Sequence, residues 1–553
     1  AIKEVLSALT PDDVNIMVSC KDPKKELDKI EPWFQTEYAV SDIPNDWRET
    51  WRNAKPDESF KMPEPNIFLT SNFDILPITE ADKNVQYPVK IHYNELCEVW
   101  YRRDVIFKLP VAYMNFYLIS PLSLSTSKDA TAMGLYVQIL RQMLIEELYP
   151  AIVADLNCSI TASDKGIVLK FYGYNEKLDL LLEAVVNCMA RFNNYLTPEL
   201  FAALKDVQAK YYYNTFLKPA KLSKDLRMSL LLQTHWSAVD KYAALAGIDL
   251  LTMKEFASNF IKHFAATNAC NKVLEILEFA PLLPATQPEI CVLELPLGEH
   301  CCRVKSFNAE DTNSIVTNYY QSGPFDIKSY CIVELIMMFM EEPVFDVLRT
   351  KEQLGYHVYS SLRYTFGIVG FSVTVNCQAY KYRKQMKKEL AEIRSSLIKL
   401  KTLKDIHLKE EVNRNWEEIS SGEYMFDRQK QEVACLEGIK MPEIRKWLVN
   451  HVQHGSKHNF RKLSVQVVGI AEIKKIKKEQ VSPILFRKVR RGSKERQPLP
   501  QSEQITIPDS VSSTGHSLEF IISDQKNHSK KFICGIEEFK TDLNIYPVTK
   551  IEH

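Results

Sequence analysis

Apolar and polar positions alternate with two periods along this chain, and they divide much of it into recognisable elements. The run VAYMNFYLIS at 111–120 is rich in β-branched and aromatic residues, which is typical of a strand. Residues 129–156 carry apolar side chains at helical spacing, with an interruption at Pro150. The stretch at 158–174 then predicts a hairpin whose turn lies near residues 164–166.

Two helices are expected after this hairpin. KLDLLLEAVVNCMARF has apolar residues at helical spacing, and TPELFAALKDVQAKYY begins with Thr197 as N-cap and Pro198 in the first turn. Near the N-terminus, VNIMVSC at 14–20 predicts a strand from its β-branched residues. From residue 22 to about residue 70 the pattern gives way to prolines, charges and isolated aromatics, which indicates an extended linker.

The same order of elements recurs later in the chain. A strand at 314–323 is followed by a helix at 326–341, a hairpin at 356–375 and a charged helix at 381–401. Gly-Ile-Val opens the second strand of each hairpin, at Gly166 and at Gly367, 201 residues apart. This offset is too long for a solenoid repeat.

The repeat therefore predicts an α+β fold with two homologous domains. Each domain is expected to be a mostly antiparallel sheet with helices packed on one face. KLSVQVVG at 462–469 is predicted to be a late strand of the second copy.

Composition excludes some classes of function. The 553 residues include 70 basic and 70 acidic side chains, so the net charge favours neither nucleic acid nor a membrane surface as a partner. The most apolar segment, 330–340, is short and contains Glu334, which predicts a buried helix. The 12 cysteines form no CxxC pair, so we expect reduced thiols in a cytoplasmic protein. The basic stretch 474–501 is expected to be a solvated loop, and a nucleic-acid role for Lys474–Arg496 would require binding with a steep salt dependence.

A search for metal ligands finds no complete set. His92 begins an HxxE sequence, but Leu96 stands where the second histidine of HxxEH would be needed. His407 fails in the same way, with Glu411 in that place. The histidines at 451, 454 and 458 have no carboxylate near them in the sequence. We expect no metal site and no catalytic centre formed by this chain alone.

The stretch RTKEQLGYHVYSS at 349–361 allows two interpretations. Pro343 is predicted at the first position of a short helix, and Gly355 is predicted to end it in the left-handed conformation. Arg349 then lies within the helix, and Tyr356 is the first residue after the stop. Both side chains could simply pack against the neighbouring sheet. Alternatively, a guanidinium and a phenol directed at one point could stabilise an oxyanion that forms during peptide hydrolysis.

The longer run LRTKEQLGYHVYSSLRYTFGIVGFSVTV resembles the C-terminal half of the insulinase-type (pitrilysin, inverzincin) zinc metalloendopeptidases. RTKEQLGY is very similar to the signature of the family's fourth domain. HLKEEVNRNWEEI, YMFDRQ and KLSVQVVG are similar to the branch of the family that cleaves at dibasic sites. The resemblance covers essentially the whole chain.

This resemblance implies a domain organisation. Family members hold four homologous domains in two bowl-shaped halves that close like a clamshell around a peptide. Residues 1–30 would be the end of the second domain and 31–70 the linker between the halves. Residues 71–285 would be the third domain and 286–553 the fourth, both catalytically inactive.

The resemblance also implies a division of the active site. The family's zinc is bound by HxxEH and a distant glutamate in the first domain, so zinc belongs to the N-terminal half and none is expected on this chain. Arg349 and Tyr356 match the residues that reach from the C-terminal half to the substrate. The implied partners are an N-terminal catalytic half and peptide substrates, and no nucleic acid or membrane. The alternative is a non-catalytic relative that binds peptides or a protein partner.

Overall fold

The structure is a computed structural model that divides the chain into two units, Ala1–Asn66 and Ile67–His553. It describes residues 2–20, 27–55, 57, 59, 61–62, 64–75, 77–94, 97–262, 265–267, 287–308, 311, 313–351, 355, 357–377, 390–469, 517–521 and 530–547. In these ranges, no helix combines the length and the apolar character that a membrane span requires.

The first unit contains little regular structure in its described part. Its elements are α1 (Ile2–Ala8), β1 (Lys29–Ile30), β2 (Glu37–Tyr38) and α2 (Asn45–Arg52). β1 pairs with β2, whereas residues 14–20 are exposed and form no strand. The predicted strand at 14–20 is therefore wrong: β-branched residues favour extended backbone, but a strand also needs a partner for its hydrogen bonds.

The first sheet of the second unit has four strands in the order β6-β7-β5-β8, and all its pairs are antiparallel. Its strands are β5 (Val111–Ile119), β6 (Asn157–Ser163), β7 (Gly166–Tyr174) and β8 (Ala265–Thr267). The predicted strand and hairpin are confirmed, with Asp164 and Lys165 in the turn.

Helices bury one continuous apolar core with this sheet. Tyr136 on α5, Val185 on α6 and Phe260 on α11 are almost fully buried in it, together with Phe171 of β7. Thr197 caps α8 by accepting a hydrogen bond of 3.2 Å from the amide of Leu200, as predicted. The helices of this region are α4 (Leu122–Ser125), α5 (Ser127–Val153), α6 (Leu178–Ala190), α7 (Phe192–Tyr195), α8 (Pro198–Phe216), α9 (Pro219–Leu231), α10 (Ala238–Leu245) and α11 (Leu250–Lys262).

The second sheet has six strands in the order β11-β12-β10-β13-β9-β14. Antiparallel pairs join β11, β12, β10 and β13, whereas β9 runs parallel to both β13 and β14. The strands are β9 (Gly298–Lys305), β10 (Ser314–Pro324), β11 (His357–Thr365), β12 (Ile368–Cys377), β13 (Arg461–Val468) and β14 (Lys530–Phe532).

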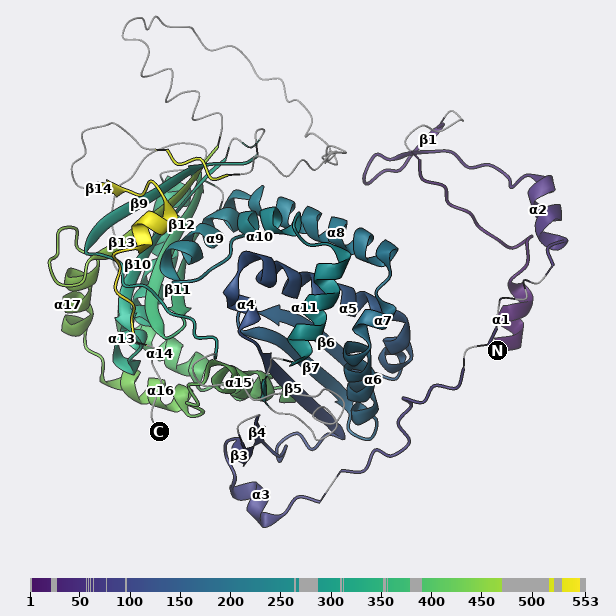
Figure 1. The fold of residues 1–553 in the computed structure, drawn as a ribbon, viewed down its shortest axis with the longest axis horizontal. Coiled ribbons are helices and arrows are strands. Elements are labelled where there is room, and N and C mark those ends of the chain that lie inside the picture. Colours follow the sequence, from purple (N-terminus) through teal and green to yellow (C-terminus); the bar gives the residue numbers. More distant parts are fainter. Residues whose placement is uncertain are drawn as a thin grey trace, which may run out of the picture. The chain divides into compact units, whose positions relative to one another are not determined.

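Helices lie on both faces of the second sheet (Figure 1). On β10, Tyr320 faces the core formed with α13, α14, α16 and α17, and its ring stacks on Phe371 at 4.7 Å. Its neighbour Tyr319 faces the opposite core, which α9 closes with Leu226 and Leu230. The helices are α13 (Ile327–Phe345), α14 (Leu390–Lys401), α15 (Leu408–Ser421), α16 (Arg428–Gly438), α17 (Met441–His451) and α19 (Ile536–Lys540), with the π-helical segment η2 (Asp346–Lys351) after α13.

The two sheets share one arrangement. β6-β7-β5-β8 in the first corresponds to β11-β12-β10-β13 in the second, with a hairpin at one side and the preceding strand next to it. Gly166 and Gly367 both have positive φ, of 148° and 82°, where their hairpins turn. The α+β fold with mostly antiparallel sheets is confirmed; the domain boundaries and the bowl shape stay predictions.

A separate hairpin links the start of the second unit to its later helices. Helix α3 (Glu80–Asn84) precedes β3 (Val89–Tyr93) and β4 (Glu98–Tyr101), which pair with each other. Trp100 on β4 stacks on Tyr424, which follows α15, with ring centroids 5.0 Å apart. This hairpin therefore packs on helices that belong to the second repeat.

Candidate functional site

Arg349 lies in a π-helical turn that directly continues a long helix. α13 passes through Pro343 without a break and ends at Phe345, and η2 follows over Asp346–Lys351. The predicted start of a separate helix at Pro343 is therefore wrong. Proline cannot donate the hydrogen bond to the carbonyl four residues earlier, and π-helical turns within helices are frequent at functional sites.

Neighbouring side chains fix the position of this turn. Leu348 is buried with Val358 of β11 and Val375 of β12, so η2 is anchored to the second hairpin. The guanidinium carbon of Arg349 lies 4.6 Å from the centroid of the Phe345 ring, one turn earlier, and Arg349 is half-buried. Part of the guanidinium is thus held by a cation–π contact, and the side chain remains partly accessible.

The other predicted site residue, Tyr356, lies outside the described residues. Gly355 is half-buried, and β11 begins at the exposed His357, one residue after Tyr356. The predicted approach of Arg349 and Tyr356 to one point stays a prediction, as does the left-handed conformation of Gly355.

The histidines considered as metal ligands have other contacts. Nε2 of His92 lies 3.1 Å from the side-chain Nδ2 of Asn94, and His407 is the N-cap residue of α15. His451 stacks on Trp447 with ring centroids 4.2 Å apart, and burial lowers its pKa. Among the described residues, no three His, Cys, Asp or Glu side chains are arranged to hold a metal ion.

Glu411, which stands where HxxEH would need its second histidine, pairs with a basic side chain. Its carboxylate lies 3.3 Å from Nε of Arg102, which follows β4. Burial raises the pKa of Glu411, and the charges of Arg102 and Arg414 partly offset this effect. Glu411 therefore joins α15 to the end of the β3–β4 hairpin by an ion pair.

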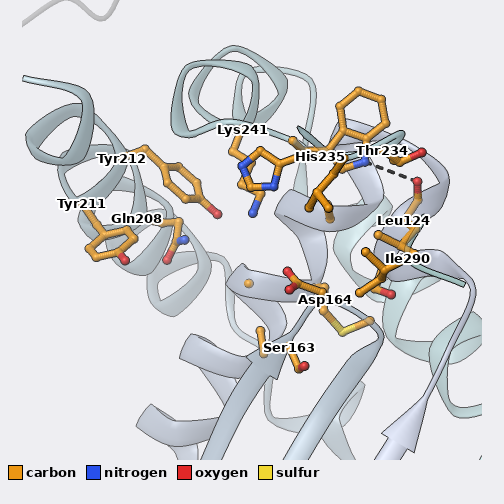
Figure 2. Close-up of a pocket in the computed structure, with 17 residues that line it drawn as sticks. Leu124, Ser163, Asp164, Gln208, Tyr211, Tyr212, Thr234, His235, Lys241 and Ile290 are labelled. Carbon is orange, nitrogen blue, oxygen red and sulfur yellow. Dashed lines mark hydrogen bonds between the residues drawn. The ribbon is translucent and has the colours of Figure 1, made fainter. Parts of the chain in front are cut away.

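One cavity of about 230 Å³ lies beside the turn of the first hairpin. Figure 2 shows Asp164 of that turn together with Tyr212 from α8, His235 from the loop before α10, and Lys241 from α10. The dashed line in Figure 2 is the 3.4 Å hydrogen bond from the Trp236 indole to the carbonyl of Leu124 in the cavity wall.

Several polar groups that line this cavity form hydrogen bonds with neighbouring protein groups. His235 Nε2 lies 2.8 Å from Asp225, whose other carboxylate oxygen accepts a hydrogen bond of 2.6 Å from the amide of Ala238. Burial raises the pKa of Tyr212 to about 12, and a hydrogen bond with Gln208 partly offsets this increase. Asp225 therefore joins α9 to the start of α10, and we find no nucleophile hydrogen-bonded to His235 among the described residues.

The sequence did not indicate this cavity, because its walls come from separate elements with no shared motif. Asp164, Lys241 and Tyr212 bring polar groups to the lining of the cavity, which is a common feature of small-molecule sites. It holds no acid, base and nucleophile in catalytic contact.

The chain is similar to known proteins over most of its length. The family model described as "Middle or third domain of peptidase_M16" matches residues 1–244, and the model described as "Peptidase M16 inactive domain" matches residues 231–405. Human nardilysin is 37% identical over 503 residues, which cover 85% of this chain and 43% of that protein. A nardilysin-like protein of Arabidopsis thaliana is 29% identical over 506 residues, covering 85% of this chain and 49% of that protein.

A more distant relative and a solved structure agree with these matches. Human insulin-degrading enzyme is 26% identical over 481 residues, covering 81% of this chain and 47% of that protein. The chain thus spans about half the length of the curated relatives it matches. The crystal structure of pitrilysin superimposes with a TM-score of 0.68 at 14% identity, covering 95% of this chain and 53% of that chain, which shows a shared fold.

Proposed function

This chain belongs to the M16 family of peptidases, and from that membership we propose that it is the C-terminal half of a nardilysin-like zinc metalloendopeptidase. The match to human nardilysin carries the proposal, because it covers 85% of this chain but 43% of the relative. The chain would enclose and position peptides for cleavage at dibasic sites, and an N-terminal half would supply the reaction centre.

Zinc is the metal that membership of this family implies. The described residues do not fit a zinc site, since no three potential ligands come together among them. The proposal places the metal in the N-terminal half because of the family membership, and it assigns no step of the reaction to a metal on this chain.

Within this proposal, Arg349 and Tyr356 support the transition state of peptide hydrolysis. The guanidinium of Arg349 offers several N–H donors, and the phenol of Tyr356 can donate a hydrogen bond. Donors directed at the oxygen where negative charge develops lower the barrier. The anchoring of η2 by Leu348 supports this role, because a fixed donor loses little entropy on binding.

We also propose that the protein acts in the cytoplasm. Ten cysteines are free thiols in the part of the chain whose side chains the structure describes, which is typical of proteins from a reducing compartment.

A second candidate function is peptide or protein binding without catalysis. The match of residues 231–405 to the peptidase M16 inactive domain favours it. An extended peptide could pair with the outermost strand of a sheet without any metal.

Mixing this chain with an N-terminal half of a nardilysin that carries HxxEH would separate the two functions. The peptidase proposal predicts cleavage of a dibasic peptide by the mixture, loss of cleavage on adding a zinc chelator, and none by either half alone. A folded chain that binds the peptide but restores no cleavage with the N-terminal half would instead favour the binding function.

A further inference from the structure

Two arginines on the α9 face of the six-stranded sheet have no acidic partner among the residues that the structure describes. Arg227 comes from α9 and Arg363 from β11, and both lie close enough to Tyr319 and Tyr359 for these phenols to affect their pKa values. Arg363 also lowers the pKa of Arg227 by charge repulsion, after the larger effect of burial. Two guanidinium groups are thus held near each other although their charges repel.

The contacts of Arg227 do not neutralise its charge. Arg227 is 5% exposed, and its guanidinium carbon lies 5.9 Å from the centroid of the Tyr319 ring. In the described ranges Arg227 forms no ion pair and no hydrogen bond. None of its nitrogens is among the fully buried atoms that lack a hydrogen-bond partner. A buried charge normally has a partner, so this position is costly unless an anion completes it.

The described surroundings of Arg363 contain neutral hydroxyl groups. Its Nε donates a hydrogen bond of 2.8 Å to the hydroxyl of Ser372, and no carboxylate pairs with it in the described part of the sheet. The hydroxyl of Tyr319 is buried without a hydrogen-bond partner. It lies beside Gly370, the residue paired with Arg363 across the strands, where a Cβ would come within 2.8 Å of that hydroxyl.

The position of these residues in the sheet favours a peptide as the source of the anion. Arg363 and Tyr359 belong to β11, which is the outermost strand at its end of the sheet, and Tyr359 is 47% exposed. An extended peptide lying along such a strand can place one of its own groups beside the strand's side chains. A planar carboxylate matches the paired N–H groups of a guanidinium.

We propose that Arg227 and Arg363 form a binding site for a carboxylate of the peptide, which is either its C-terminal group or an acidic side chain. The site rests on the proposed function, because it takes the peptide to be the ligand of this chain. It is separate from Arg349, which lies on η2, before the strand.

Peptide binding to this chain tests the site directly. Isothermal titration would compare a dibasic peptide that has a free C-terminus, the same peptide amidated, and amidated forms with an internal Glu or Gln. The proposal predicts about 10-fold tighter binding of at least one acid form than of its neutral partner. A difference in affinity between the free and the amidated C-terminus would show that the C-terminal carboxylate is bound. A difference between the Glu and Gln peptides would show that a side-chain carboxylate is bound.

Variants would show whether Arg227 and Arg363 cause the preference for acidic over neutral peptides. Arg363→Gln, at a half-buried position, is expected to reduce the acid preference to near one, and Arg227→Gln is expected to do the same if circular dichroism shows that it folds. Arg141→Gln, on the exposed face of α5, is the matched control and should keep the full preference.

Equal binding of all acid and neutral peptides, no peptide binding at all, or a full preference in Arg363→Gln would overturn the site. If the chain binds inorganic phosphate but shows no preference for acidic over neutral peptides, the arginines bind a free anion. That result would also overturn the proposed carboxylate site. Because no cleavage is measured, the proposed function can stand if the reassembled enzyme cleaves peptides while the acid preference is missing.

Discussion

The hydroxyl of Tyr424 donates a hydrogen bond of 2.6 Å to the carboxylate of Glu98, across 326 positions of sequence. The same carboxylate lies 3.1 Å from Nζ of Lys90, and the Tyr424 ring stacks on Trp100. The β3–β4 hairpin is therefore attached to the end of α15 by a charged hydrogen bond and an aromatic contact, whereas the ion pair of Lys90 with Glu98 lies within the hairpin.

Tyr424→Phe removes the hydrogen bond and keeps the stacking. We expect a loss of about 1.5 kcal/mol in the free energy of unfolding, because a hydrogen bond to a charged group is lost. Denaturant midpoints of the two proteins would measure it. Tyr149→Phe, in an exposed part of α5, is the control and should have no effect; equal midpoints for wild type and Tyr424→Phe would contradict this account of the contact.

A second prediction concerns the buried cluster around Lys401. Its Nζ lies 2.9 Å from Glu334 and 2.7 Å from Glu432, and the Glu432 side chain is 3% exposed. Lys401→Met leaves two carboxylates without a cation, so we expect destabilisation of about 3 kcal/mol. The triple variant with Glu334→Leu and Glu432→Leu should recover most of this loss in the same denaturation experiment, and no recovery would show that charge burial is not the cause.

Local patterns were enough to predict several of these elements, including α13 with Glu334 inside it. The first hairpin and the Thr197 cap were also predictable, because apolar spacing, turn residues and capping act within a few residues. The position of α9 on the second face, and with it Arg227 beside Arg363, was not predictable, since only tertiary packing brings them together. Pro343 was misread because a tightly packed helix continued past the proline.

The repeated hairpin turn gives a third prediction. At Gly166, with φ of 148°, a Cβ would lie 1.9 Å from the carbonyl oxygen of Leu118 on the neighbouring strand. Gly166→Ala should therefore destabilise the chain by more than about 3 kcal/mol or prevent its folding. Gly247→Ala is the matched control, since its Cβ would meet nothing closer than 3.6 Å; equal yields and melting temperatures for both variants would contradict the turn's requirement for glycine.

We expect the stability of the fold to decrease in acid because of Glu176, which binds the chain near the start of the second unit. Its carboxylate accepts hydrogen bonds of 2.7 Å from the amides of Ser71 and Asn72, and these bonds lower its pKa from 4.5 to about 2. Because the folded pKa lies below the unfolded value, this stabilisation is complete above about pH 4.5 and is lost as the pH falls toward about 2.

Thermal midpoints at pH 5 and pH 3 would show this effect. The midpoint should fall less for Glu176→Gln than for the wild type, because the variant has no carboxylate to protonate. Glu146→Gln, on the exposed face of α5, should behave like the wild type. An identical fall in all three proteins would exclude a role for Glu176.

The central claim is that this chain contributes Arg349 to peptide hydrolysis at a centre completed by an N-terminal half. The most direct measurement is kcat and KM for a dibasic peptide in the reassembled enzyme, with Arg349→Ala, Arg349→Lys and the control Arg141→Ala. We expect Arg349→Ala to lower kcat by about 100-fold with little change in KM, since the interaction is made mainly in the transition state. Arg349→Lys should recover part of the rate, and Arg141→Ala should match the wild type. A wild-type kcat in Arg349→Ala would contradict the claim.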